Sequence, residues 1–219
     1  MNLTVVIGLL AQFFFSARIL VQWIKSERAH RIESPTLFWL FSVIGSVLLF
    51  AYGWMRDDFS IIFGESLSFY IYLWNLKAKG LYDRMAQANK LLLAIPWVLA
   101  ILPVLLLLFI GMNAADFRQQ FFRNEDVPLY ALLWGSLGQF IYKSRFVYQW
   151  YYSFRHRQSL LPLTFWWLAV IGSAMIIVYG IYRLDWILCL GQIGIIASIR
   201  NIVIGRRQFA TKRETARVP

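Results

Sequence analysis

Two arginines, Arg18 and Arg145, interrupt apolar segments of this chain and stand 127 residues apart. Each is followed four residues later by a glutamine, Gln22 or Gln149, which a helix would place on the same face. Ionisable side chains inside a bilayer usually face a bundle interior or a water-filled cavity. The guanidinium is a planar fork of donors that suits phosphate. The pattern therefore predicts two equivalent arginines that together grip an anionic group.

A second interpretation of the same arginines stays open. Each lies about two turns from one end of its apolar segment, so its side chain could extend to the headgroups. Two more glutamines, Gln12 and Gln139, lie six residues before the arginines and deeper in the segment. They are about a quarter-turn from the helix face that each arginine shares with its following glutamine. The four glutamines could bind sugar hydroxyls if the arginines bind substrate.

Glu65 is a carboxylate inside an apolar segment, and Gln192 stands at its matching position. Glu65 could pair with an arginine or lie at the outer interface. It could also couple a proton or cation, or contact substrate. Asn75 and Asn201 match if one residue is deleted after Gly191. Small polar residues also join helices in membranes, so each asparagine could be a ligand or a packing contact.

These residues belong to a tandem repeat that runs without a gap from residue 8 to 64 and again from 135 to 191. The copies share polar and aromatic residues as well as apolar ones, which composition alone does not explain. Further matched pairs include Trp23/Trp150, Pro35/Pro162, Phe38/Phe165, Trp39/Trp166, Gly45/Gly172, Ser46/Ser173 and Tyr52/Tyr179. In membranes, parallel repeats are a transporter architecture. The aromatic residues after each proline, 38–39 and 165–167, are expected at the membrane interfaces.

The composition places the chain in a bilayer. Of its 219 residues, 59% are hydrophobic and 15% charged, where a soluble domain carries about 25% charge. Seven segments are long enough, or nearly so, to cross about 30 Å of hydrocarbon. We expect spans at 3–24, 36–54, 60–76, 91–111, 129–152, 163–182 and 185–204.

The predicted fold is an all-α polytopic membrane protein with two parallel three-helix repeats and a linker helix between them. The first repeat would occupy residues 1–80, the linker with its helix 81–128, the second repeat 129–205 and a basic tail 206–219. One linker helix gives both repeats the same orientation. Because the module is duplicated within one chain, we expect a functional monomer.

The net charge of +11 is distributed unevenly along the chain. Segments 25–34, 77–90, 153–162 and 205–219 carry +1, +3, +2 and +4, whereas the alternate loops are neutral or negative. The positive-inside rule places these four segments in the cytoplasm and the N-terminus in the periplasm. Topology and attraction of the tail to anionic phospholipids explain the charge without nucleic acid.

Several chemistries have no support in the sequence. The single cysteine, Cys189, forms neither a disulfide within the chain nor a thiolate cluster. No Walker loop, dinucleotide fingerprint, Gly-x-Ser-x-Gly or His-Glu-x-x-His motif is present. We therefore expect no cofactor, no metal and no catalysis. A transferase that used Glu65 as base would lack a second acid.

The repeated residues resemble the lipid A biosynthesis N-terminal domain family, a three-helix membrane module. The resemblance rests on Gln12-Phe13, Arg18, Gln22-Trp23, Ser34-Pro35, Phe38-Trp39, Gly45, Tyr52, Arg56, Asp58, Gly64 and Asn75. The family is named for its place ahead of the lipid-A-disaccharide synthase catalytic domain, and is similar to PQ-loop and SWEET transporters. Because this chain shows no glycosyltransferase domain, the resemblance does not imply synthase activity.

Two functions follow from the resemblance and the residues together. The first is an inner-membrane carrier or flippase for a lipid-linked anionic envelope intermediate, such as a polyprenyl-phosphate sugar or a lipid A precursor. In this carrier, Arg18 and Arg145 would hold the phosphate. Glu65 would couple transport to a proton or cation, or select the substrate. The second is a non-catalytic membrane anchor or partner of glycosyltransferases that modify lipid A. A water-soluble substrate, such as a free sugar or amino acid, is a third alternative.

Overall fold

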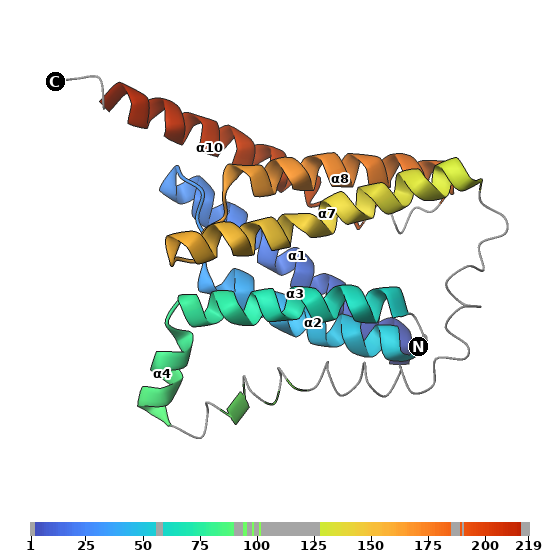
Figure 1. The fold of residues 1–219 in the computed structure, drawn as a ribbon, viewed down its shortest axis with the longest axis horizontal. Coiled ribbons are helices and arrows are strands. Elements are labelled where there is room, and N and C mark those ends of the chain that lie inside the picture. The colour runs from blue at the N-terminus through green and yellow to red at the C-terminus, as the bar shows by residue number, and fades with distance from the viewer. Residues whose placement is uncertain are drawn as a thin grey trace. The chain divides into compact units, whose positions relative to one another are not determined.

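The computed structural model describes residues 3–55, 59–89, 94–95, 98, 101, 128–184, 189 and 191–215. Within these residues the chain forms seven helices and no strand, which confirms the expected all-α class (Figure 1). In chain order they are α1 (Leu3–Ala29), α2 (Thr36–Met55), α3 (Phe59–Ala78), α4 (Leu81–Ala88), α7 (Leu129–His156), α8 (Leu163–Tyr182) and α10 (Ile195–Thr215).

Five expected spans coincide with described helices, namely α1, α2, α3, α7 and α8. Most of the expected linker helix at 91–111 lies outside the described residues. The expected span at 185–204 differs from the structure, because residues 191–194 form a turn and the helix begins at Ile195. Two of the four turn residues are glycines. The helix then continues to Thr215, through much of the segment expected as a tail.

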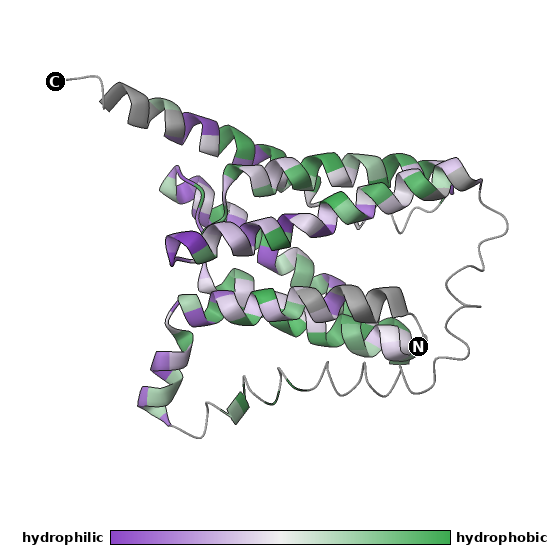
Figure 2. Ribbon diagram, viewed as in Figure 1, coloured by the Kyte–Doolittle hydropathy of each residue, from purple (hydrophilic) through white to green (hydrophobic). Residues whose placement is uncertain are grey.

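Three of the described helices are long and apolar enough to cross a membrane, namely α1, α2 and α8. Helices α2 and α8 are mostly hydrophobic along their whole length, as Figure 2 shows. Hydrophilic residues are concentrated near the C-terminal end of α7 (Figure 2). The helices therefore have the character of a membrane protein, with polar residues near one end of α7.

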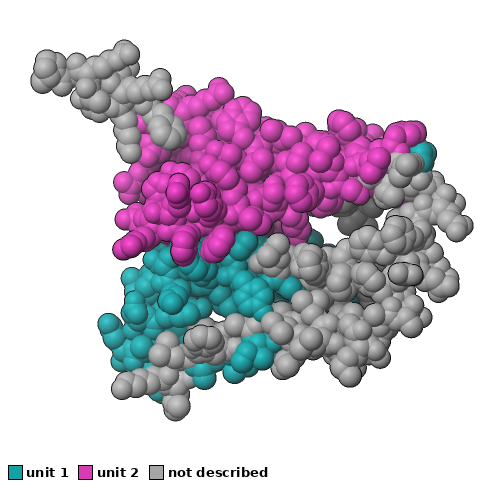
Figure 3. Space-filling model, in the orientation of Figure 1, with its two compact units in different colours: residues 1–14, 39–128 teal, residues 15–38, 129–219 magenta. Residues whose placement is uncertain are grey.

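The chain divides into two compact units that do not follow the repeat boundaries (Figure 3). Unit 1 comprises residues 1–14 and 39–128, and unit 2 comprises residues 15–38 and 129–219. The second part of α1 and the loop after it thus belong with α7, α8 and α10. Residues of the first repeat and of the second repeat consequently meet within unit 2.

The repeat is visible in the helix contacts as well as in the sequence. In unit 1, a Cβ added at Gly8 would come within 2.9 Å of the Tyr52 ring. In unit 2, a Cβ added at the matched Gly135 would come within 2.8 Å of the matched Tyr179 ring. The first and second helices of each copy therefore approach closely at equivalent glycines, where a larger residue would not fit without movement.

The loop after the first helix is also held in the same way in both copies. The Ser26 side chain accepts a hydrogen bond from the Glu33 backbone N–H over 2.9 Å. The Ser153 side chain accepts the equivalent bond from the Leu160 N–H over 3.0 Å. Both serines are buried. These bonds fix the polar end of the first helix, one turn beyond each glutamine of the Arg–Gln pattern.

Candidate functional site

A small cavity in unit 2 brings together the two arginines that the sequence analysis singled out. Arg18 comes from α1 and Arg145 from α7, and only 6% and 4% of their surfaces are exposed. The cavity measures about 10 Å³, which is the space that about one water molecule needs. It is lined by Arg18, Ile19, Phe38, Tyr142, Arg145, Phe165, Trp166, Gly194 and Ser198.

Both guanidiniums lie over the same aromatic ring. Their central carbons are 5.3 Å (Arg18) and 4.9 Å (Arg145) from the centre of the Phe146 ring. The two positive charges are therefore within about 10 Å of each other. A desolvated cation over an aromatic face gains about 2 kcal/mol. This gain only partly offsets the cost of burying two like charges, which is several kcal/mol for each ion.

The remaining rings follow the repeat. Arg18 lies 4.4 Å from the Phe15 ring, and Arg145 lies 3.7 Å from the ring of Tyr142, the residue matched to Phe15. Phe38 and Phe165, another matched pair, are 5.5 and 5.1 Å from their respective guanidiniums. The two arginines thus occupy equivalent aromatic settings, as their sequence positions led us to expect.

Trp166 adds a third donor to the cavity lining. This α8 residue is 2% exposed, and its buried indole N–H has no hydrogen-bond acceptor among the described residues. An indole nitrogen can only donate. A buried donor without an acceptor costs about 1–3 kcal/mol, so its presence beside two guanidiniums calls for an explanation. No carboxylate is among the described residues that line the cavity.

The glutamine and asparagine of unit 2 pair with each other. Gln22 donates from Nε2 to Asn201 Oδ1 over 2.8 Å, and Asn201 donates from Nδ2 to Gln22 Oε1 over 3.0 Å. Neither side chain has any exposed surface. Gln22 also donates to Ser26 over 2.8 Å. These bonds join α1 to α10 beside the cavity, and in this arrangement they occupy both ends of the Gln22 amide.

The other candidate glutamines and Asn75 lie outside the cavity lining. Gln149 is buried and donates to Ser153 and to the Leu160 carbonyl, each over 2.8 Å. Gln12 and Gln139 are exposed on α1 and α7. Asn75, in unit 1, is buried and donates to the carbonyl of the residue four positions earlier over 2.8 Å. Asn201 makes the same bond in unit 2, which supports the expected one-residue deletion.

Glu65 lies in unit 1 and not in the cavity of unit 2. It is 3% exposed, and Ser46 donates to its Oε2 over 3.0 Å. In unit 2, the matched Ser173 donates to Gln192 Oε1 over the same 3.0 Å. A carboxylate and an amide thus hold the same place in the two copies. The two copies therefore differ here by one ionisable carboxyl group, which only unit 1 carries.

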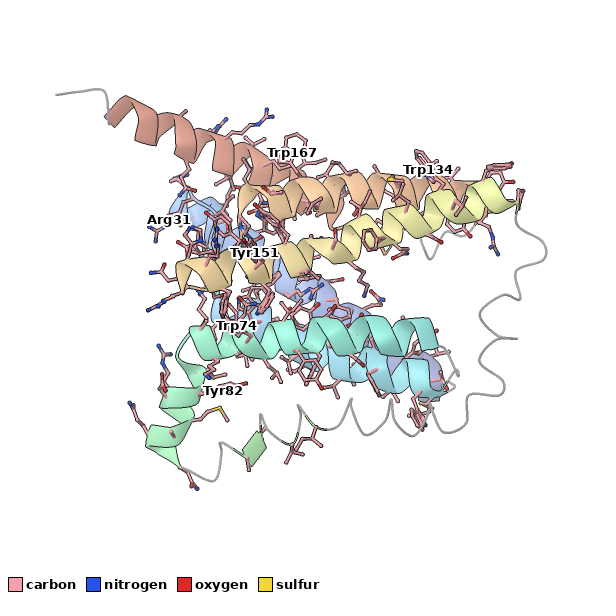
Figure 4. The ribbon with its side chains drawn as sticks, viewed as in Figure 1. Arg31, Trp74, Tyr82, Trp134, Tyr151 and Trp167 are labelled. Atoms are coloured by element: carbon pink, nitrogen blue, oxygen red, sulfur yellow. The ribbon has the colours of Figure 1, made fainter. Side chains whose placement is uncertain are left out.

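The aromatic residues of the cavity correct one expectation from the sequence. Phe38, Phe165 and Trp166 were expected at the membrane interfaces, but they are buried, with 1–2% of their surfaces exposed. Trp39 of unit 1 was expected there too and has no exposed surface. Trp167 alone of the second set is exposed, at 38%, and lies on α8 as labelled in Figure 4. Interior aromatics recur unchanged in both copies, whereas Trp167 is matched by Leu40. Recurrence in both copies is therefore the sequence feature that distinguishes the buried aromatic residues from the exposed Trp167.

An ion pair makes a further link between α1 and α10 within unit 2. Arg200 donates to both carboxylate oxygens of Glu27, and its Nε lies 2.8 Å from Glu27 Oε2. Both side chains are about two-fifths exposed. The described residues contain no group of three His, Cys, Asp or Glu side chains placed to hold a metal ion. Glu27 and Arg200 are not among the residues that line the cavity, where the charged side chains are Arg18 and Arg145.

Comparison with known proteins agrees with the repeat. The Lipid A Biosynthesis N-terminal domain matches this chain twice, at residues 7–77 and 134–203. The chain is 30% identical over 202 residues to the lipid-A-disaccharide synthase of Chlamydia abortus, covering 90% of this chain and 32% of that protein. It is 25% identical over 212 residues to that of Chlamydia trachomatis serovar D, covering 94% and 35%. The chain spans about a third of the length of these curated relatives.

No solved structure matches the chain. Each matched segment begins one residue before a copy of the repeat, and each contains one arginine of the cavity. Together they cover more than half of the sequence. The chain therefore belongs to the Lipid A Biosynthesis N-terminal domain family and contains two copies of that domain.

Proposed function

We propose that this chain is a membrane carrier or flippase for a lipid-linked anionic intermediate of envelope biosynthesis, either a lipid A precursor or a polyprenyl-phosphate sugar. The family relates the chain to lipid A biosynthesis. The observation that carries the proposal is the pair of buried guanidiniums, Arg18 and Arg145, around one cavity. Their substrate group would be phosphate, which a guanidinium binds with two parallel hydrogen bonds.

Electrostatics favours an anion at this place. Two like charges within about 10 Å raise each other's energy, and burial removes the water that would stabilise them. An anion between them reverses both effects, because it attracts each guanidinium in a low-dielectric setting. A helix that merely anchors a protein gains nothing from such a pair. The cost of the arrangement therefore supports a binding role.

The size of the cavity supports a closed arrangement of the site. A space of about 10 Å³ admits about one water molecule and not a phosphate group. Substrate would enter only when α1 separates from α7, α8 and α10, which form most of the other walls together with Phe38 and Gly194. A carrier requires such a change, because its site must close on one side before opening on the other. The Gln22–Asn201 pair and the Glu27–Arg200 ion pair hold α1 to α10 in the closed arrangement.

For the whole chain we propose two parallel three-helix repeats around a linker helix, with seven spans in the bacterial inner membrane. The N-terminus would be periplasmic and the C-terminus cytoplasmic, where the basic end of α10 would meet anionic phospholipids. One chain would be the functional unit. A reporter fused after Pro219 tests the orientation: activity confined to the cytoplasm is expected, and activity confined to the periplasm would contradict it.

The remaining polar residues have secondary roles in this proposal. Glu65 would couple transport to a proton or cation, or select substrate, since it is a buried ionisable group that the second copy lacks. Gln12 and Gln139 are exposed on the first helices and would meet sugar hydroxyls as the headgroup passes. Gln22, Gln149, Asn75 and Asn201 would exchange their present hydrogen bonds for substrate contacts in the open arrangement.

Translocation of a labelled phosphoglycolipid in reconstituted vesicles tests the function. Arg18→Lys with Arg145→Lys keeps both charges but removes the guanidinium forks, so transport should fall at least about tenfold. Arg28→Ala with Arg155→Ala is the matched control, because these arginines also recur in the repeat but are exposed. Transport that the Lys pair leaves unchanged would show that the cavity arginines do not hold the substrate.

A second candidate is a non-catalytic membrane accessory of glycosyltransferases in lipid A biosynthesis. It is favoured by the relatives, which are named lipid-A-disaccharide synthase and which this chain matches over about a third of their length. A segment that is fused to a synthase in those relatives could, as a separate chain, serve such an enzyme in trans. Cross-linking in native membranes followed by mass spectrometry tests this role. Recovery of no glycosyltransferase would count against it.

A further inference from the structure

We infer that Trp166 is a third ligand-binding residue of the Arg18–Arg145 cavity and that the cavity takes the terminal phosphate monoester of a lipid. The inference rests on the proposed function and narrows its substrate class. Trp166 lines the cavity, is 2% exposed and has a buried indole N–H with no acceptor among the described residues. It comes from α8, whereas the arginines come from α1 and α7.

The lining is rich in donors, which argues for an anion and against a buried water molecule. A guanidinium carries five N–H donors and no acceptor, and the indole carries one donor. A water oxygen accepts only two hydrogen bonds and must also donate its own two protons. Ser198, the hydroxyl from α10 in the lining, already donates to the Gly194 carbonyl over 3.0 Å. A phosphate accepts bonds at every non-bridging oxygen, so it can accept from several of these donors at once.

The number and charge of the donor groups distinguish two kinds of phosphate. A phosphate monoester has three non-bridging oxygens and a charge of about −1.5 to −2 at neutral pH. Three donor groups from three helices give each oxygen one partner, and the charge balances two guanidiniums. A phosphodiester has two non-bridging oxygens and one charge, so it offers one oxygen fewer to the three donor groups and offsets only one of the two guanidinium charges. A polyprenyl-phosphate sugar is such a diester, so the inference favours a glycolipid that ends in phosphate.

The repeat provides a matched control for Trp166. Its counterpart, Trp39, belongs to unit 1, is equally buried and lies 6.1 Å from the Tyr72 ring, centre to centre. Trp39 is not among the residues that line the cavity. Trp166→Phe and Trp39→Phe therefore remove the same N–H from the same position of the two copies. Only the first removes a donor from the cavity.

The experiment uses the full chain in nanodiscs that contain a neutral lipid and one probe. The probes are dioleoyl phosphatidate, a phosphate monoester, dioleoyl phosphatidylglycerol, a phosphodiester, and inorganic phosphate without either lipid. Native mass spectrometry measures the bound fraction for the wild type and both variants. In parallel, ¹⁵N-tryptophan placed only at position 166 reports its indole N–H resonance in the wild type. This second measurement needs no substitution, so it stays valid even if a variant does not fold.

We expect the wild type to bind phosphatidate at least about tenfold more tightly than phosphatidylglycerol, as one charge-assisted hydrogen bond contributes. Trp166→Phe should abolish most of this preference, and Trp39→Phe should retain it. Phosphatidate, and not phosphatidylglycerol, should move the Trp166 N–H resonance downfield, because an anionic acceptor strengthens its hydrogen bond.

Four results would overturn the inference. Equal binding of both lipids that still requires the arginines would reject the monoester and leave the proposed function standing. An unmoved Trp166 resonance with an unchanged preference in Trp166→Phe would reject the third donor. A resonance that moves with inorganic phosphate but not with phosphatidate would assign the site to a soluble phosphate. Binding of neither lipid through Arg18 and Arg145 would reject the inference and the proposed function together.

Discussion

The side-chain amides of Gln22 and Asn201 donate hydrogen bonds to each other, over 2.8 and 3.0 Å, with no surface exposed. Gln22 lies one turn beyond Arg18 on α1, and Asn201 lies one turn beyond Ser198 on α10. The pair therefore joins two walls of the cavity close to its charged residues. Because each amide satisfies the other, breaking the pair from one side leaves a buried polar group behind.

Replacing one member of this pair should destabilise unit 2. Gln22→Leu leaves the Asn201 amide without its α1 partner, and we expect a loss of about 1–2 kcal/mol. An unsatisfied buried group costs about 1–3 kcal/mol. A hydrogen bond between membrane helices contributes only about 0.6 kcal/mol to stability on average. The double variant Gln22→Leu with Asn201→Leu should lose less than the sum of the single losses. Unfolding in mixed micelles measures these values.

Gln12→Leu is the control for this experiment. Gln12 is exposed on the same helix, so its replacement should change the free energy of unfolding by less than about 0.5 kcal/mol. Strictly additive losses for Gln22 and Asn201 would show that the two amides do not interact.

The Glu27–Arg200 ion pair should stabilise the closed arrangement only weakly, and less at high salt. Both side chains are about two-fifths exposed, so water and ions screen their attraction. Glu27→Gln and Arg200→Gln, alone and together, form a double-mutant cycle. We expect the coupling measured at about 0.05 M salt to shrink markedly at about 0.5 M. A coupling that salt does not change would indicate a buried contact and not an exposed pair.

Glu65→Gln should leave the fold intact and separate structure from function. Gln192 already holds this place in the second copy, with the same 3.0 Å bond from its serine, so we expect the free energy of unfolding to be retained or to rise, because the change removes a buried ionisable group. Gln192→Glu, the reverse change, buries a new charge and should cost about 2–3 kcal/mol. Thermal unfolding measures both values. If Glu65 couples transport to a proton or cation, or selects substrate, Glu65→Gln should also lower translocation in vesicles although the protein remains folded.

Gly172→Ala should disturb the cavity through helix packing. A Cβ at Gly172 would lie 2.7 Å from the Tyr142 backbone nitrogen, which cannot move without shifting α7. Tyr142 lines the cavity, and its ring lies 3.7 Å from the Arg145 guanidinium. We expect a loss of about 1–3 kcal/mol and weaker phosphate binding, measured by unfolding and native mass spectrometry.

Gly8→Ala, at another close helix contact, serves as the comparison for Gly172→Ala. The added Cβ would meet the end of the Tyr52 side chain at 2.9 Å, and a side chain can adjust more easily than a backbone. We therefore expect a smaller loss of stability, and equal losses in the two variants would contradict this explanation.

The sequence predicted the helices best where apolar runs are long, as in α2 and α8, because length and hydropathy alone define such segments. It also predicted that Arg18 and Arg145 are equivalent, because the repeat matches them and their neighbours. The start of α10 was not predictable from hydropathy, since the apolar run continues through the turn at residues 191–194. The turn depends on two glycines, one of which, Gly194, approaches Ile19 of α1.

The role of Trp166 could not be predicted from its type or spacing. Tryptophan near the end of a membrane helix is most often interfacial, and Trp167 fits that pattern. The repeat alone distinguishes the two adjacent tryptophans, because Trp166 recurs as Trp39 whereas Trp167 is matched by Leu40. The pairing of Gln22 with Asn201, 179 residues apart, depends on the position of α1 within unit 2. Such long-range contacts leave no periodic signal in the sequence.

Native mass spectrometry with lipid extraction, on protein purified gently from its own membrane, tests the binding role of Arg18 and Arg145 most directly. We predict that a phosphorylated glycolipid is retained by the wild type and by the control Arg28→Ala with Arg155→Ala, but not by Arg18→Lys with Arg145→Lys. The same bulk phospholipids on all three proteins, with no glycolipid on any, would contradict the proposal that these arginines hold a lipid-linked phosphate.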